Sequence, residues 1–206
     1  MARFDKPLET WQARYAGDDF HFGRDPNVFV RNRAPLLAPG SSVLCVADGE
    51  GRNSVFLAEQ GARVTAFDFA LNAVAKAQRL AAERGVTVDF RVSDIQSWDW
   101  AAASYDAVVA IFIQFLAPED RARVFAGMRA AVKPGGLMLL EGYRPEQVDY
   151  GTGGPPNREN MYTAPWLREE FAGWEIVALD AYDAHLEEGT RHVGMSALID
   201  LVARKP

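Results

Sequence analysis

The apolar residues of this 206-residue chain alternate between two periods, and this alternation constrains the fold more than any other feature. Short apolar runs typical of buried strands cover 43–47, 63–68, 86–92, 105–113 and 137–143. Segments with helical spacing lie between them, at 53–60, 70–85 and 118–132. Strands that alternate with helices indicate a parallel sheet with right-handed crossovers. The pattern therefore predicts a doubly wound α/β fold.

The pattern changes near residue 144, where a turn-rich stretch precedes a short helix predicted at 164–171. Residues 174–182 and 192–204 then alternate like two antiparallel strands. The expected fold is a mostly parallel, seven-stranded, Rossmann-like sheet with a C-terminal antiparallel hairpin. We expect one domain, 1–206, made of an N-terminal helical cap (1–40), a core (41–143) and a substrate loop with the hairpin (144–206).

Composition excludes several classes of protein. No apolar stretch approaches the roughly 18 residues of a membrane span, and the N-terminus has no apolar signal region, so a cytoplasmic location is expected. Twenty-eight acidic against 22 basic side chains give a net charge of −6, which disfavours a nucleic-acid partner. The single cysteine, Cys45, excludes an internal disulfide, and no Cys/His spacing suggests a metal site.

The stretch SVLCVADGEGRN, residues 42–53, joins the first strand to the first helix through Gly49 and Gly51. Glycines at this point let a ligand approach the backbone beside a helix N-terminus, although any tight strand-to-helix turn also favours glycine. Asp48 and Glu50 add two carboxylates to the loop, which would repel a pyrophosphate. The ligand is better interpreted as a nucleoside without phosphates.

Two further acids follow neighbouring strands. Asp68 ends the second strand, 17 residues after Gly51, where such folds place a carboxylate that accepts hydrogen bonds from ribose hydroxyls. Asp94 follows the third strand, where a carboxylate can accept from an exocyclic amine such as that of adenine. Both positions favour a nucleoside lying across the ends of the strands.

Five segments in register, VLCVADGEGRN, VTAFDFA, VSDIQSW, YDAVVAIF and VKPGGLMLLEGY, together resemble the class I S-adenosylmethionine-dependent methyltransferases over about residues 40–143. The resemblance is closest to the small bacterial tellurite-resistance and thiopurine-type branch, since it extends to residues 11–29 and to the C-terminal hairpin. It implies S-adenosylmethionine as cofactor and a small molecule as methyl acceptor.

The resemblance also implies which residues contact the cofactor. Gly49 and Gly51 would line its methionine and ribose, Asp68 its ribose hydroxyls, and Ile111 would lie beside the methyl group. The family's usual first-motif acid would fall at Cys45 and its first glycine at Ala47, so we infer that Asp48 meets the ammonium group. The full predicted contact set is Trp11, Arg14, Tyr15, Asp48, Gly49, Gly51, Asn53, Asp68, Phe69, Asp94, Ile95 and Ile111.

The acceptor side must come from segments outside this core. Trp11, Arg14 and Tyr15 share one face of a short N-terminal helix that could fold over the cofactor or simply pack there. Residues 150–156, YGTGGPP, could form a lid or an ordinary exposed turn. Tyr143 and His192 are the candidate catalytic residues, with Tyr162 a third polar side chain to consider.

The sequence thus predicts direct in-line methyl transfer, in which the protein mainly positions the reactants and excludes water. Two alternatives stay open at this point. A nicotinamide-dependent oxidoreductase would place a third glycine where Ser54 stands and has no need of Asp94. A sensor protein could keep the cofactor site without catalysis.

Overall fold

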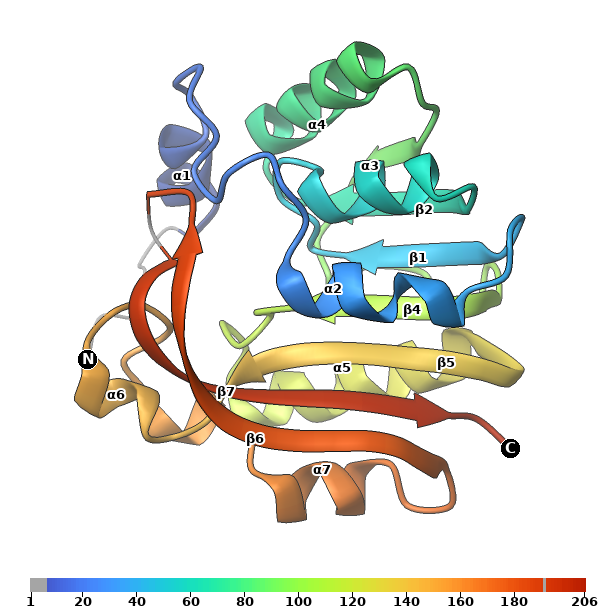
Figure 1. Cartoon of the computed structure of the whole chain (residues 1–206), viewed down its shortest axis with the longest axis vertical. Coiled ribbons are helices and arrows are strands. Elements are labelled where there is room, and N and C mark those ends of the chain that lie inside the picture. Colours follow the sequence, from blue (N-terminus) through green and yellow to red (C-terminus); the bar gives the residue numbers. More distant parts are fainter. Residues whose placement is uncertain (1–6, 191) are drawn as a thin grey trace.

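The structure is a computed structural model that describes residues 7–190 and 192–206. Its single sheet contains seven strands in the order β3-β2-β1-β4-β5-β7-β6 (Figure 1). The strands are β1 (Ser42–Val46), β2 (Arg63–Asp68), β3 (Asp89–Val92), β4 (Tyr105–Ile111), β5 (Val132–Tyr143), β6 (Glu175–Glu188) and β7 (His192–Arg204). Strands β1 to β5 are parallel, whereas β7 runs antiparallel to both β5 and β6. The predicted fold class is confirmed.

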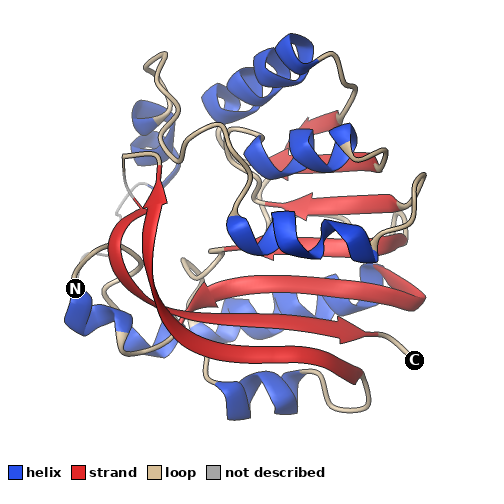
Figure 2. Ribbon diagram, viewed as in Figure 1, coloured by secondary structure: helices blue, strands red, loops and turns tan. Residues whose placement is uncertain are grey.

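Helices cover both faces of the sheet (Figure 2). They are α1 (Pro7–Arg14), α2 (Val28–Arg33), α3 (Arg52–Glu59), α4 (Leu71–Arg84), α5 (Pro118–Ala131), α6 (Gln147–Tyr150) and α7 (Ala164–Glu170). Two 3₁₀ turns, Ala34–Leu36 and Arg158–Asn160, complete the helical parts of the described residues. Apolar side chains of α2 and α3 pack with Val43 and Cys45 of β1 on one face, and those of α5 and α7 pack with Leu44 and Val46 on the other. None of the helices in the described ranges is long and apolar enough to cross a membrane.

Two strands are at least five residues longer than predicted, whereas β3 (predicted at 86–92) and β4 (predicted at 105–113) are shorter. β5 begins at Val132 rather than at residue 137, because the KPGG segment forms a bulge within the strand: Tyr105 pairs with Val132, and Ala107 already pairs with Leu137. β6 continues to Glu188, six residues beyond its predicted end, because the β6–β7 hairpin extends past the rest of the sheet as a two-stranded ribbon.

Strand order places the ligand crevice. The connection after β3 returns to β4 on the far side of β1, so the strand order reverses between β1 and β4, and ligands of such sheets bind beyond the carboxyl ends there. Helix α1 and the tip of the β6–β7 hairpin both lie at this end of the sheet (Figure 1). Gln12 ties α1 to the start of α4 by accepting from the Asn72 backbone N–H at 2.9 Å.

Close packing of α3 against α4 depends on Gly51, the N-cap residue of α3, which has a φ of 89°. A Cβ at this position would lie 2.6 Å from the Ala77 Cβ and 2.9 Å from the Ala77 Cα. Gly85, at the end of α4, also has a positive φ of 68°, but a Cβ there would meet nothing within 4 Å. A substitution at Gly85 therefore tests backbone strain alone, whereas a substitution at Gly51 tests backbone strain together with steric overlap.

We expect Gly85→Ala to lower the free energy of unfolding by about 1 kcal/mol, the cost of a left-handed alanine. Gly51→Ala is expected to lower it by about 2–4 kcal/mol, because overlap with α4 adds about 1–3 kcal/mol to the same backbone cost. Urea denaturation of both variants measures the difference. Equal losses would show that α4 moves aside without cost.

Candidate active site

The loop after β1 carries three residues in the left-handed backbone region: Ala47 at φ 48°, Gly49 at φ 64° and Gly51 at φ 89°. Ala47 stands where the family's first glycine would fall, and it adopts a positive φ despite its Cβ. Strained backbone of this kind is concentrated at functional sites. The left-handed turns let the loop pass the carboxyl end of β1 with Gly49 and Gly51 buried.

Asp68, the last residue of β2, holds this loop. Its carboxylate accepts from the Gly49 N–H at 3.0 Å and from the Ala70 N–H at 2.9 Å. Burial raises the pKa of Asp68 to about 6, against the lowering effect of these backbone hydrogen bonds. Asp68, which the sequence predicts to bind the ribose, thus also supports the conformation of the glycine loop.

Asp48 lies in the same loop, half-buried, and accepts a hydrogen bond from the Ser54 hydroxyl at 2.5 Å. Burial raises its pKa to about 7, with a smaller contribution from the negative charge of Asp68. A nearby cation would favour the ionised form of both carboxyl groups. Asp48 and Asp68 therefore form a site at the ends of β1 and β2 that favours a positively charged ligand group.

Glu50 faces another direction. Its carboxylate forms a buried ion pair with Lys76 at 2.5 Å and accepts from the backbone N–H groups of His21 at 2.7 Å and Phe22 at 3.3 Å. The sequence places both acids in the loop, and the structure pairs Glu50 with α4. Glu50 thereby fastens residues 19–23, which we call the strap, over the loop.

A cavity of about 620 Å³ opens at the carboxyl ends of β2 and β3, large enough for a small ligand. Its lining brings together Phe69 and Asp94, two of the predicted contacts, with Leu8 and Glu9 of α1 opposite them; the lining residues are Leu8, Glu9, Phe69, Val92, Ser93, Asp94 and Ser97. Ile95 does not line it, because its side chain is buried in the core with Phe67.

The three predicted residues of the N-terminal helix lie close together. Trp11 stacks on Tyr15 with ring centroids 5.4 Å apart, and the Arg14 guanidinium lies 4.6 Å from the Trp11 ring centroid. The Tyr15 hydroxyl lies 3.4 Å from where a Cβ on Gly49 would stand, so this buried ring covers the glycine loop. Arg14 itself is exposed.

Four rings gather beside the loop, and we call Phe22, Phe112, Tyr143 and His192 the aromatic cluster. Ring centroids lie 4.6 Å apart for Phe112 and Tyr143, for Phe112 and His192, and for Phe22 and His192. Phe112 directly follows Ile111 at the end of β4 and has a φ of 56°, a strained value for an aromatic residue. The Tyr143 hydroxyl is buried and has no hydrogen-bond partner within residues 7–190 and 192–206.

Sequence reasoning missed Phe22 and Phe112, since neither belongs to a recognisable motif and a strained φ cannot be read from residue types. It also missed Glu188 and Arg52, a buried ion pair at 2.8 Å beside the cluster. The only available signal was the acidic LEEG stretch before His192.

Two other predicted or considered residues lie away from the crevice. Tyr162 is fully buried on the α5 side of the sheet, with its ring stacked on Trp166 at 5.4 Å. Asn53 is buried and its side-chain oxygen accepts from the Asn27 N–H at 2.9 Å, which fixes the start of α2. Ile111 is half-buried at the end of β4.

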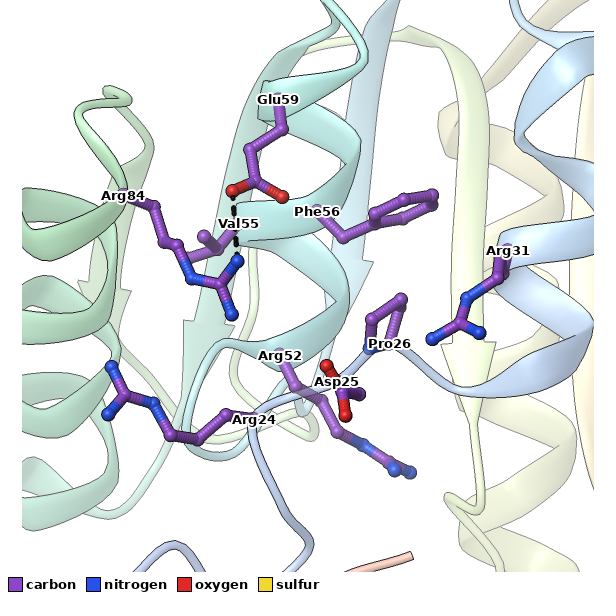
Figure 3. A pocket seen from close by; sticks show the side chains of 9 residues that line it. All are labelled: Arg24, Asp25, Pro26, Arg31, Arg52, Val55, Phe56, Glu59 and Arg84. Carbon is purple, nitrogen blue, oxygen red and sulfur yellow. Dashed lines mark ion pairs between the residues drawn. The ribbon is translucent and has the colours of Figure 1, made fainter.

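A second cavity, of about 200 Å³, lies beside α3 between α2 and α4 (Figure 3). Its lining is mostly charged, with Arg84 and Glu59 paired at 3.6 Å across it; the lining residues are Arg24, Asp25, Pro26, Arg31, Arg52, Val55, Phe56, Glu59 and Arg84. None of the residues predicted to contact the cofactor lines it, so the cavity at Phe69 and Asp94 remains the candidate cofactor site.

Comparison with known proteins gives one consistent result. The methyltransferase domain family matches residues 43–136. A thiopurine S-methyltransferase of Pseudomonas putida is 30% identical over 217 aligned positions, covering 94% of this chain and 96% of that protein. A ubiquinone biosynthesis O-methyltransferase of Methylobacterium nodulans is 39% identical over 157 positions, covering 68% of this chain and 60% of that protein.

The chain spans between 41% and 60% of the length of the first ubiquinone-biosynthesis relatives that it matches. Among solved structures, the N-methyltransferase NodS of Bradyrhizobium japonicum, in complex with S-adenosylhomocysteine, matches with a TM-score of 0.70 and 17% identity, covering 98% of this chain and 100% of that one. These comparisons support the interpretation of the chain as a methyltransferase. They give no support to the alternatives of an oxidoreductase or a sensor protein.

The raised pKa values of Asp48 and Asp68 predict that binding depends on pH. Free folded protein keeps these protons up to about pH 7 and pH 6, so their contribution to stability is present at low pH and is lost as pH rises through those values. A ligand ammonium group beside Asp48 needs the carboxylate. Affinity for S-adenosylhomocysteine should therefore rise about twentyfold between about pH 6 and pH 8, about tenfold from ionisation of Asp48 and about twofold from ionisation of Asp68.

Isothermal calorimetry at both pH values measures this change, and buffers of different ionisation enthalpy report the proton released. Asp48→Asn should reduce the pH dependence to about twofold, the part due to Asp68. An unchanged pH dependence in Asp48→Asn would place the ligand's ammonium group elsewhere.

Proposed function

This chain belongs to the class I S-adenosylmethionine-dependent methyltransferases, and we propose that it methylates the sulfur of a small aromatic thiol by direct in-line transfer. The observation that carries this proposal is the aromatic cluster beside the cofactor loop. Flat rings of Phe22, Phe112 and His192 suit a flat acceptor, and they surround the end of β4 where the methyl group would lie.

The relatives favour the same class of acceptor. The relative that matches over almost its whole length is named as an S-methyltransferase of thiopurines, which are flat and carry sulfur. The ubiquinone-biosynthesis relatives, named as O-methyltransferases, match over a shorter part of their length. A hydroxyl acceptor is therefore the second candidate.

When bound, S-adenosylmethionine supplies a methyl group on a sulfonium, which needs little activation. The chain's own residues hold the reactants in line and exclude water. The glycine loop approaches the ligand closely, Asp68 accepts from ribose hydroxyls, and Asp48 balances the ammonium charge. Phe69 and Asp94 hold the adenine in the cavity of about 620 Å³.

We propose the remaining roles on the same basis. Tyr143 and His192 are the proposed catalytic residues, since both belong to the aromatic cluster. The proposed cofactor contacts are Trp11, Arg14, Tyr15, Asp48, Gly49, Gly51, Asp68, Phe69, Asp94 and Ile111; Asn53 and Ile95, also predicted from the sequence, are buried away from the crevice and are not included. Residues 1–206 are proposed to act as one methyltransferase domain in the cytoplasm, with a small-molecule partner and no nucleic acid.

Residues 150–156 are proposed as a lid. They pack on the acceptor side: the Thr152 hydroxyl donates to the Met195 carbonyl at 2.5 Å, and a Cβ on Gly154 would lie 2.9 Å from the Tyr143 ring. Gln147 joins this loop to β7, because it donates to Thr152 at 3.0 Å and accepts from the Ala197 N–H at 2.8 Å.

The cofactor assignment predicts the effect of Asp68→Asn. Replacing the carboxylate by an amide should weaken S-adenosylhomocysteine binding by about 1.5–3 kcal/mol, roughly 10- to 150-fold, because hydrogen bonds to a charged group are lost. Calorimetry gives the affinity, with Asp89→Asn at the opposite end of the neighbouring strand as the control. Wild-type affinity in a folded Asp68→Asn protein would contradict the ribose assignment.

The acceptor assignment predicts turnover of arenethiols. Thiophenol and catechol, each supplied with S-adenosylmethionine, test sulfur against oxygen; the methylated product and S-adenosylhomocysteine are measured by mass spectrometry. We expect methylated thiophenol to form at the higher rate. Faster methylation of catechol would favour the hydroxyl candidate, and binding of S-adenosylhomocysteine without any product would contradict an aromatic acceptor.

A further inference from the structure

Glu188 forms a buried polar pair with His192, which belongs to the aromatic cluster. Glu188 ends β6 and His192 begins β7, and their side chains are only 8% and 11% exposed. Glu188 Oε2 lies 3.4 Å from His192 Nδ1. A carboxylate can only accept a hydrogen bond, so the pair favours the tautomer in which Nδ1 carries the proton and Nε2 presents its lone pair.

Glu188 is itself fixed by two donors from the opposite side of the site. Arg52 donates from Nη2 to Glu188 Oε2 at 2.8 Å, and Asn27 donates from Nδ2 to Glu188 Oε1 at 3.1 Å. Arg52 directly follows Gly51 of the glycine loop. The orientation of Glu188 is therefore tied to the loop that we assign to the cofactor.

His192 also lies close to the three other rings of the aromatic cluster. Its ring centroid lies 4.6 Å from those of Phe22 and Phe112 and 6.0 Å from that of Tyr143. Phe112 follows the end of β4, where the methyl group would lie. The imidazole thus lies beside the end of β4 and the strap, with the Glu188 carboxylate and the charge of Arg52 as its polar neighbours.

The charges around this group suit a proton acceptor. Burial opposes ionisation of Glu188, but His192 and Arg52 outweigh it and hold the pKa of Glu188 at about 2. Burial lowers the pKa of His192, and the hydrogen bond that His192 donates to Glu188 offsets part of that shift. Burial also raises the pKa of Tyr143 and, together with the charges of Asp200 and Glu188, that of Glu141 in β5. His192 is the only group among these that is neutral and basic near neutral pH.

We propose that His192 Nε2 accepts the proton of the methyl acceptor and that Glu188 is the positioning residue that fixes the required tautomer; this proposal rests on the proposed methyl transfer. The acceptor's S–H bond breaks, and its proton goes to the Nε2 lone pair. The electron pair left on the acceptor sulfur forms the bond to the methyl carbon. The electrons of the broken carbon–sulfonium bond stay with the leaving thioether.

A base is needed only for an acceptor that arrives protonated, which gives a test within one enzyme. Phenylmethanethiol, an alkyl thiol whose pKa lies above neutral as the cysteine value of about 8.5 does, needs the base at neutral pH. 4-Nitrothiophenol is already ionised there. We expect His192→Gln to lower kcat for phenylmethanethiol by about 10²–10⁴-fold and to lower kcat for 4-nitrothiophenol by less than about tenfold.

Glu188→Gln tests the positioning role. A glutamine amide can donate to Nδ1 and so favours the tautomer with the proton on Nε2, which cannot accept; the analogous change in serine proteases costs about 10⁴-fold in kcat. We expect a loss of about 10- to 10⁴-fold with phenylmethanethiol and little loss with 4-nitrothiophenol. Glu187→Gln is the matched control, because that neighbouring side chain is 81% exposed. Equal losses with both thiols would overturn the proposal.

Nitrogen NMR of the imidazole provides a readout that does not depend on turnover. The wild-type protein should show His192 with the proton on Nδ1, and Glu188→Gln should shift it to Nε2 and lower the pKa of His192. A wild-type imidazole protonated on Nε2 would overturn the positioning role. Calorimetry with S-adenosylhomocysteine separates the methyltransferase function from the role of Glu188. If the wild-type protein does not bind S-adenosylhomocysteine, the methyltransferase function is contradicted. If it binds but carries the His192 proton on Nε2, only the role of Glu188 is contradicted.

Discussion

Two buried ion pairs attach distant parts of the chain to the glycine loop, and the closure of the site depends on them. Glu50 pairs with Lys76 of α4 and holds the strap, while Arg52 pairs with Glu188 at the tip of the hairpin. Removing one partner of a buried pair leaves an uncompensated charge and typically costs about 3–5 kcal/mol. The glycine loop therefore holds the strap and the hairpin tip in place through these two ion pairs.

Glycines and charged residues alternate in the loop with different tasks. Gly49 lies under the Tyr15 hydroxyl and Gly51 lets α3 pack closely on α4, while Glu50 and Arg52 direct their side chains to the strap and the hairpin. Four neighbouring residues thus make contacts with four different parts of the chain. This division explains why the loop is acidic without all of its acids facing the ligand.

The mostly parallel sheet, the glycine loop and the positions of Asp68 and Asp94 could be predicted from the sequence, because hydrophobic period and short motifs are local. The direction of Glu50 could not be predicted, since it depends on Lys76, which lies on a different helix. The same holds for the Glu188 and Arg52 pair, whose members lie 136 residues apart, and for the strained backbone at Phe112. Long-range side-chain pairing and backbone strain are properties of the packed structure.

The strap and the hairpin turn meet backbone to backbone: a Cβ on Gly189 would lie 2.4 Å from the Gly23 nitrogen, and the Thr190 N–H donates to the His21 carbonyl at 3.1 Å. The two segments are separated by 169 residues. During synthesis on the ribosome, β1 to β5 can pair and Glu50 can hold the strap before the hairpin turn has emerged, whereas the contacts of the strap with Gly189 and Thr190 form only afterwards. A nascent chain in which only these five strands have emerged therefore has its glycine loop and its strap, but lacks the hairpin that completes the cover over them.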